Sequence, residues 1–297
     1  MRSELWRLLR TAAQGWWSDR AMSLGASIAF FTVFSLAPML LAVIAVAGLA
    51  FGQEAAQGAI VAELGGLLGD KAAETIEAMI ASANNVESGI IGTTLGIGTF
   101  LVLVTGAIIE LQDVLNLIWK VKPPERYGVA DFLRVRLLSL GLVLGFGFLL
   151  LVSLIVDAGL TALSSYLEAS FSGAATILKV LNSLVAFAMA VLLFAMIFKI
   201  LPDVDLTWRD VWIGAVGTGV LFTAGKFLIG WYLGSSNVAS SYGAAASIIT
   251  ILLWVYYSSL ILLFGAEFTK AYAEGRGSHS GNPDRSQDPP TRAAARG

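Results

Sequence analysis

The sequence has no cysteine and a single histidine, His279, among its 297 residues. Without cysteine the chain forms no disulfide, holds no metal through thiolates and has no cysteine nucleophile. The histidine lies in a polar stretch near the C-terminus, so it offers no histidine pair for acid–base chemistry. These absences argue against a hydrolytic enzyme. We expect no catalytic residues, no cofactor and no bound metal.

Charged residues are also scarce. Asp, Glu, Lys and Arg make up 13% of the chain, whereas 57% of it is hydrophobic, and the mean hydropathy is +0.77. Several apolar runs reach the roughly 20 residues that a helix needs to cross a bilayer. They do not alternate polar and apolar residues over about 10 positions, as the strands of a membrane barrel do. The composition therefore predicts an all-α integral membrane protein.

Six apolar segments are long enough to be membrane-spanning helices. They cover residues 25–51, 90–118, 137–157, 176–200, 211–234 and 244–271. The sequence therefore predicts a six-transmembrane-helix bundle formed by residues 21–272. An even number of spans places both ends of the bundle on the same side of the membrane.

Lysine and arginine gather on one side of this predicted bundle. They are frequent in the N-terminal segment, after the second and fourth spans, and in the C-terminal tail. On the opposite side, the first loop has Lys71 as its one basic residue, against six acidic residues. Because basic loops stay in the cytoplasm, both termini are predicted to be cytoplasmic. The protein is predicted to be a multi-pass protein of the bacterial plasma (inner) membrane.

Three segments lie outside the predicted spans. Residues 1–20 are expected to form a cytoplasmic interfacial helix, because its leucines share a face opposite Arg7 and Arg10. The charges that recur through this segment also argue against a cleavable signal. Residues 53–88 have the apolar spacing of two short amphipathic helices, broken near GDK, which we expect on the outer surface. Residues 273–297 lack apolar periodicity and are expected to be a disordered cytoplasmic tail.

Four stretches of the chain resemble a known family. They read GASIAFFTVFSLAP, LNLIWKVKPPERYGVADFLRVRLLSL, LPDVDLTWRDVWIGA and YGAAASIITILLWVYYSSLILLFGAEF. Together they resemble the YihY/BrkB family of bacterial inner-membrane proteins, over roughly residues 16–272. The resemblance implies six helices with both ends in the cytoplasm. It implies no established activity, because the names that members have carried, ribonuclease BN and virulence factor BrkB, do not describe a mechanism.

Polar residues near the ends of two predicted spans are candidates for a functional site. Glu110, Asp113 and Asn116 follow one another at intervals of three on one helical face, and Glu267 shares a stripe of the last span with Tyr256. Charge inside a membrane is costly and commonly functional. One interpretation is a carboxylate cluster of Glu110, Asp113 and Glu267 at the inner mouth of a polar cavity. The other is that these residues mark where each helix leaves the membrane.

Three further residues of the spans stand out. Lys226 lies about two-thirds of the way through the fifth span, and Asp157 ends the third span near the same depth. They form a charge pair or a substrate contact in one interpretation, and in the other Lys226 extends its ammonium group toward the membrane surface. Pro38 cannot donate a backbone hydrogen bond, so it is a candidate for a kink in the first span.

The sequence favours a transporter, a channel or a translocation factor for a lipid or another envelope solute, with a polar cavity in the bundle. The alternative is a non-transporting envelope scaffold or regulatory membrane protein. A membrane-associated ribonuclease is the least favoured, because no basic groove for RNA accompanies the carboxylates. The expected partners are membrane lipids and an unknown small or lipid-like solute. We expect no nucleic acid, and a homo-oligomer is left open.

Overall fold

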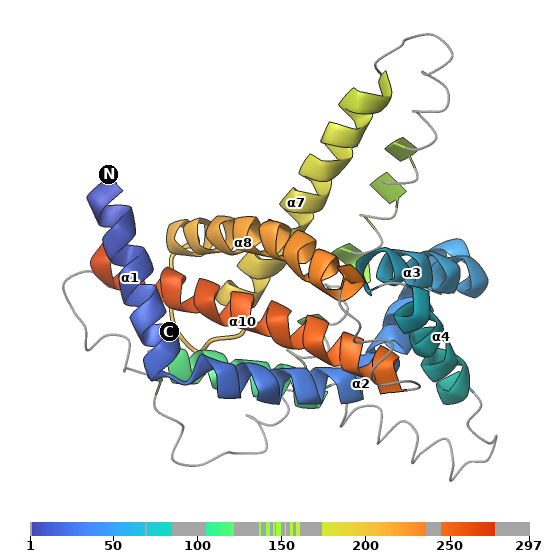
Figure 1. Ribbon diagram of the computed structural model, residues 1–297, viewed down its shortest axis with the longest axis horizontal. Coiled ribbons are helices and arrows are strands. Elements are labelled where there is room, and N and C mark those ends of the chain that lie inside the picture. The colour runs from blue at the N-terminus through green and yellow to red at the C-terminus, as the bar shows by residue number, and fades with distance from the viewer. Residues whose placement is uncertain are drawn as a thin grey trace, which may run out of the picture.

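The computed structural model describes residues 2–68, 70–84, 105–121, 174–235 and 245–276, with isolated positions between 137 and 160. The regular elements of this part of the chain are helices, and it contains no strand. The labelled helices are α1 (Arg2–Ser18), α2 (Ala21–Phe51), α3 (Gln53–Leu68), α4 (Asp70–Asn84), α7 (Ala174–Ile200), α8 (Trp208–Ser235) and α10 (Ala246–Gly275) (Figure 1). Residues 105–118 form a further helical segment beside α2.

Three of the described helices are long and apolar enough to cross a membrane. They are Thr176–Ile200 in α7, Trp208–Ile229 in α8, and Ala246–Gly275, which is α10. These helices match the last three predicted spans. The predicted second and third spans lie mostly outside the described residues, so the count of six stays a prediction.

The first predicted span has an unexpected start. Glu4–Ser18 and Ala21–Ala37 together are apolar enough to form a fourth span, but the two helices are bent by 68°. The bend lies at Arg20, whose φ of 57° and ψ of 42° place it in the left-handed region. This conformation is costly for a residue with a side chain. The chain therefore changes direction abruptly between α1 and α2, and α1 turns back toward the last helix.

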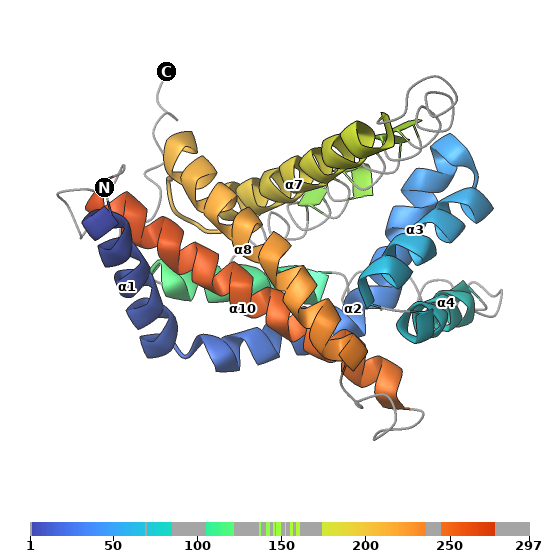
Figure 2. The same cartoon turned by 45° about the horizontal axis from the view of Figure 1, so that its top comes forward.

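Helices α3 and α4 confirm that the first loop forms two helices. Ile60 of α3 and Ile76 and Ile80 of α4 are buried. They form an apolar cluster with α2 residues such as Leu40 and Val43. The apolar stripes therefore pack on the second half of α2, at the opposite end of the molecule from α1 (Figure 2). Their position on the outer surface of a membrane stays a prediction.

Helix α10 runs between α8 and α2 and ends against α1 (Figures 1 and 2). It continues to Gly275, slightly beyond the start of the expected tail at residue 273. Ala273 is fully buried in the main apolar cluster, and Glu4 of α1 pairs with Arg276. These contacts hold the last turn of the helix in place. The rest of the expected tail, from residue 277, lies outside the described residues.

Helices α8 and α10 are antiparallel and make two reciprocal contacts. Thr218 of α8 occupies the space beside Gly265 of α10, and Thr269 of α10 occupies the space beside Gly214 of α8. Each threonine hydroxyl donates to the glycine carbonyl four residues earlier on its own helix, at 2.8 Å in α8 and 2.7 Å in α10. Small residues at such positions let helix backbones approach closely in a membrane.

We predict that Gly265→Ala destabilises the protein by about 1–3 kcal/mol, because overpacked core positions force neighbours to move. A Cβ at Gly265 would overlap the Thr218 hydroxyl and lie 2.9 Å from its Cβ. Thermal unfolding of the purified protein in detergent measures the effect. Adding Thr218→Ala should recover part of the loss. Gly58→Ala is the matched control, since a Cβ at Gly58 meets nothing within 4 Å. Equal stability of Gly265→Ala and the parent chain would contradict the close contact.

Candidate functional site

Glu267 lies inside the bundle, where it is only 4% exposed. Helix α1 crosses directly over its carboxyl group, because a Cβ at Gly15 would overlap the Oε2 atom of Glu267. The other carboxyl oxygen, Oε1, is buried and has no hydrogen-bond partner. A buried charge without full pairing is costly. The glutamate is therefore enclosed beneath α1 rather than pointing outward from the end of its helix.

Three charged groups act on Glu267, and each comes from a different part of the chain. They are Asp19 at the α1–α2 bend, Lys120 after the segment 105–118, and Lys270 on α10 itself. The Lys120 ammonium lies 2.6 Å from both carboxylate oxygens of Asp19. The Lys270 ammonium donates to the carbonyl of Ile118 at 2.8 Å. Both lysines thus donate hydrogen bonds to groups other than Glu267, whose carboxyl group lies beside Asp19.

The backbone near this group is strained at two positions. Arg20 has a φ of 57° and Lys120 a φ of 55°, and these are the two non-glycine residues with positive φ among those described. After Asn116 the helical segment closes with bonds from Lys120 N–H to Leu117 and from Val121 N–H to Asn116, at 3.0 and 2.9 Å. This is the usual helix ending in which glycine takes the left-handed position. Such strain costs about 1–3 kcal/mol per residue and clusters at functional sites.

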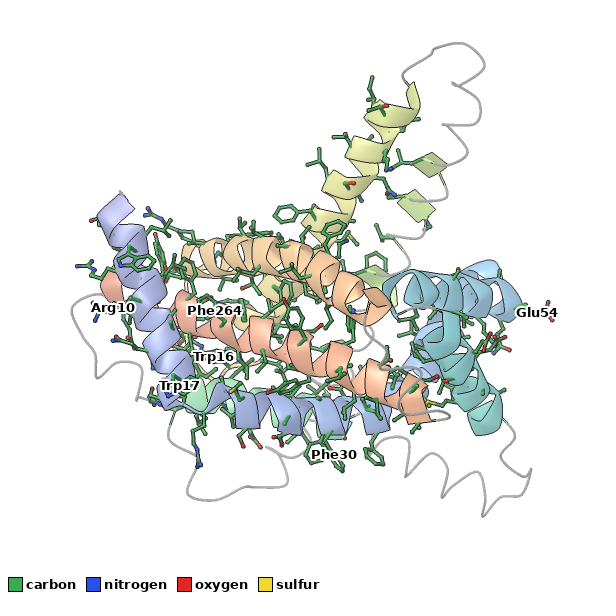
Figure 3. The ribbon with its side chains drawn as sticks, viewed as in Figure 1. Arg10, Trp16, Trp17, Phe30, Glu54 and Phe264 are labelled. Atoms are coloured by element: carbon green, nitrogen blue, oxygen red, sulfur yellow. The ribbon has the colours of Figure 1, made fainter. Side chains whose placement is uncertain are left out.

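Aromatic side chains show how α1 is seated. The Trp16 indole donates to the carbonyl of Leu260 on α10 at 3.2 Å. In Figure 3 Trp16 lies between α1 and α10, whereas Arg10 points away from the bundle. Helix α1 therefore has an apolar side that faces the bundle, and Arg7 and Arg10 are exposed. Much of its inner face contacts α10, and its position in a membrane interface stays a proposal.

The polar residues of the segment 105–118 form a second group. Ser27 of α2 donates to the Glu110 carboxylate. Asn116 donates to Asp203 at 2.9 Å and accepts from its backbone N–H at 2.8 Å. Gln112 donates to the same Asp203 oxygen at 3.1 Å. Asp203 belongs to the LPDV stretch, so two of the stretches that carried the family resemblance bind one another.

Different charges act on two members of the predicted carboxylate cluster, Asp113 and Glu267. Asp113 is exposed, and the charges that act on it are Glu110 and Asp203. Those that act on Glu267 are Asp19, Lys120 and Lys270. Among the described residues, no group of three or more His, Cys, Asp or Glu side chains could hold a metal ion.

Two of the remaining predicted residues, Tyr256 and Lys226, have contacts with residues outside these two groups. Tyr256 and Leu260 approach Gly25 of α2, with a Tyr256 ring carbon 3.6 Å from the position of a Cβ there. The Lys226 ammonium lies 5.6 Å from the centre of the Phe227 ring. Asp157 and the side chain of Pro38 lie outside the described residues. The Lys226–Asp157 pair and the kink therefore stay predictions.

Sequence reasoning missed Gly15, Asp19, Lys120 and Lys270 as neighbours of Glu267. Lys120 belongs to the basic residues that follow the second predicted span, and nothing in a single sequence pairs it with a helix so distant in the chain. Lys270 is different, because it lies three positions after Glu267 on the same helix. The signal that was available is local. Gly15 and Asp19 are four residues apart, about one helical turn, with Gly15 in α1 and Asp19 just after its end.

The fold and its buried polar groups define an α-helical membrane protein. The chain belongs to the BrkB family, because the family model described as Virulence factor BrkB matches residues 12–290. This confirms the resemblance drawn from the sequence.

The curated relatives are described as UPF0761 membrane proteins. One from Azotobacter vinelandii is 34% identical over 179 residues, which cover 59% of this chain and 41% of the relative. One from Pseudomonas aeruginosa strain LESB58 is 29% identical over 253 residues, covering 84% and 58%. One from Aeromonas salmonicida is 28% identical over 272 residues, covering 88% and 89%. The match thus covers 41% of the length of the first of these relatives and 58% of the second. No solved structure matches it.

We predict that Asp203→Ala destabilises the protein by about 1–3 kcal/mol, because it leaves the amides of Gln112 and Asn116 without their acceptor. Thermal unfolding of Asp203→Ala, Asn116→Ala and the double variant forms a double-mutant cycle. Asp205→Ala is the control, since Asp205 is an exposed acidic residue of the same loop. Strictly additive losses in the cycle would refute the coupling of the two stretches.

Proposed function

We propose that this chain is a multi-pass inner-membrane translocation factor that moves a small or lipid-like solute, with both termini in the cytoplasm. The end of the bundle that contains α1 and Glu267 is then its cytoplasmic end. The observation that carries the proposal is the buried Glu267 carboxyl group, which follows a long uncharged stretch of its helix. Because the chain covers only part of several relatives, the activity of those longer proteins is also a matter of proposal.

A purely structural role accounts poorly for Glu267. Burying a charged carboxyl group costs desolvation free energy. Only a fully paired carboxylate stabilises the fold as well as an apolar residue at the same position would. Glu267 lacks that pairing at Oε1. The two strained residues, Arg20 and Lys120, flank the same group. A buried ionisable group and strained backbone lie close together here, in a membrane bundle. This combination supports a functional site at which the carboxyl group changes its binding partner.

The alternative is a non-transporting scaffold or regulatory protein, and the α8–α10 contact favours it. Glycine and threonine interlock there without space for a solute between the two helices. A pathway would therefore have to run on another side of α10, such as the side that faces α1. We propose no enzymatic activity, because the sole histidine lies in the tail and the described carboxylates form no metal site.

We predict that Glu267→Gln inserts and folds normally but fails to complement a strain in which the gene is deleted. The substitution preserves the shape of the side chain and removes its ionisable group. Complementation and the amount of folded protein in the membrane are measured together. Glu274→Gln is the matched control, because Glu274 is an exposed carboxylate on the same helix. Full complementation by Glu267→Gln would favour the scaffold.

The membrane orientation is tested separately. Reporter fusions at His279 and within residues 53–88 should report a cytoplasmic tail and an external first loop, because basic residues gather on the tail side. The same fusions in a variant with several tail arginines replaced provide a check on the role of charge. An external tail or a cytoplasmic first loop would refute the orientation.

A further inference from the structure

We propose that Glu267 holds a proton beneath α1 and donates it in a hydrogen bond to Asp19, and that α1 is a cover whose position on α10 depends on that proton. The inference deepens the proposed function by naming the ion that the site exchanges. It rests on contacts within the purified chain, so it is testable without a known solute.

The proton belongs on Glu267. Both carboxylate oxygens of Asp19 bind the Lys120 ammonium at 2.6 Å, so Asp19 already has a cation as its partner. No ion pair of this kind joins Glu267 to a described residue, since the ammonium of Lys270, whose charge acts on Glu267, donates its hydrogen bond to the Ile118 carbonyl. As a neutral acid, Glu267 donates its hydroxyl proton to an Asp19 oxygen and leaves only a carbonyl oxygen, Oε1, unpaired. As an anion, it would bury an unpaired charge next to a second carboxylate.

A metal cation fits this place less well. The groups that face Glu267 are Asp19 from the α1–α2 bend, Lys120 from the segment 105–118, and Lys270 from its own helix. A bound cation would add repulsion from both lysines, whereas a proton adds a hydrogen bond and needs no space.

Helix α1 is built to respond to this proton. Its Gly15 backbone lies against the Glu267 carboxyl, so the anion can be hydrated only if α1 moves. Polar contacts between α1 and α10 include the Trp16–Leu260 hydrogen bond and the exposed Glu4–Arg276 pair. The bend at Arg20 gives the helix a point about which to turn. Loss of the proton at higher pH should therefore release α1 from α10.

Infrared spectroscopy of the purified full chain tests the proton directly. We expect a carbonyl-stretch band of a protonated carboxylic acid that persists after the exposed carboxyl groups have ionised and disappears as the pH rises further. Glu267→Gln should abolish the band, and Asp19→Asn should shift it, because it changes the hydrogen-bond acceptor. Glu274→Gln should leave it unchanged. Absence of such a band from the parent chain, or its survival in Glu267→Gln, would overturn the proposal.

The cover is tested by thiol labelling, for which the absence of cysteine makes every introduced thiol unique. Ala12 is 1% exposed on the inner face of α1, and Ala13 is exposed on the outer face. The labelling rate of Ala12→Cys relative to Ala13→Cys should rise about tenfold per pH unit while one proton controls opening. The ratio cancels the pH dependence of the thiol itself. In the Glu267→Gln background it should stay low at all pH values.

The two proposals fail in different ways. A titrating band together with full complementation by Glu267→Gln would keep the proton site and reject its role in translocation. If Glu267→Gln fails to complement but the parent chain shows no such band, Glu267 is needed for function and the proposed proton is refuted. A labelling ratio that does not change with pH, or that changes equally in Glu267→Gln, would reject the cover.

Discussion

The close approach of α8 and α10 fixes the position of most other parts of the site. Two glycine–threonine contacts define the separation, the register and the rotation of α10. Each threonine hydroxyl is satisfied within its own helix, so the contact leaves no polar group exposed to lipid. Because association of helices in a membrane gains little from the hydrophobic effect, such steric fit is the main source of specificity.

The rotation of α10 then determines where Glu267 lies. An α-helix turns by about 100° per residue, so the residue two positions after Gly265 points to nearly the opposite side. Gly265 faces α8, and Glu267 faces α1 and the α1–α2 bend. There the bend brings Asp19, and the end of segment 105–118 brings Lys120. The carboxyl group is thus enclosed because three chain segments meet at one turn of α10.

Local patterns in the sequence anticipated a good part of this fold. Apolar length predicted the helices of the last three spans, and helical spacing predicted α3 and α4. These features depend on residues near one another in the chain. Because the last span is largely apolar, its glutamate, Glu267, was also recognisable as a candidate site residue.

The partners of the polar residues could not be predicted in the same way. Glu110, Asp113 and Asn116 share a face of one helix, but their partners are decided by the turn at Asp203 and by Ser27. Likewise the ion pair of Asp19 with Lys120 joins residues 101 positions apart, and it requires left-handed backbone at Arg20 and Lys120. A left-handed backbone conformation is usually predicted from a glycine in the sequence. Here the two positions are arginine and lysine, so the sequence does not indicate it.

The central claim is that α1 lies along the end of α10 and covers Glu267. A disulfide in native membranes tests it most directly. The Cδ2 atom of Leu8 lies 3.7 Å from the position of a Cβ at Gly275. In this cysteine-free chain, Leu8→Cys with Gly275→Cys should cross-link under mild oxidation. Leu5→Cys with Gly275→Cys should not, since Leu5 is 53% exposed. Failure of the first pair, or equal cross-linking of both pairs, would contradict the account.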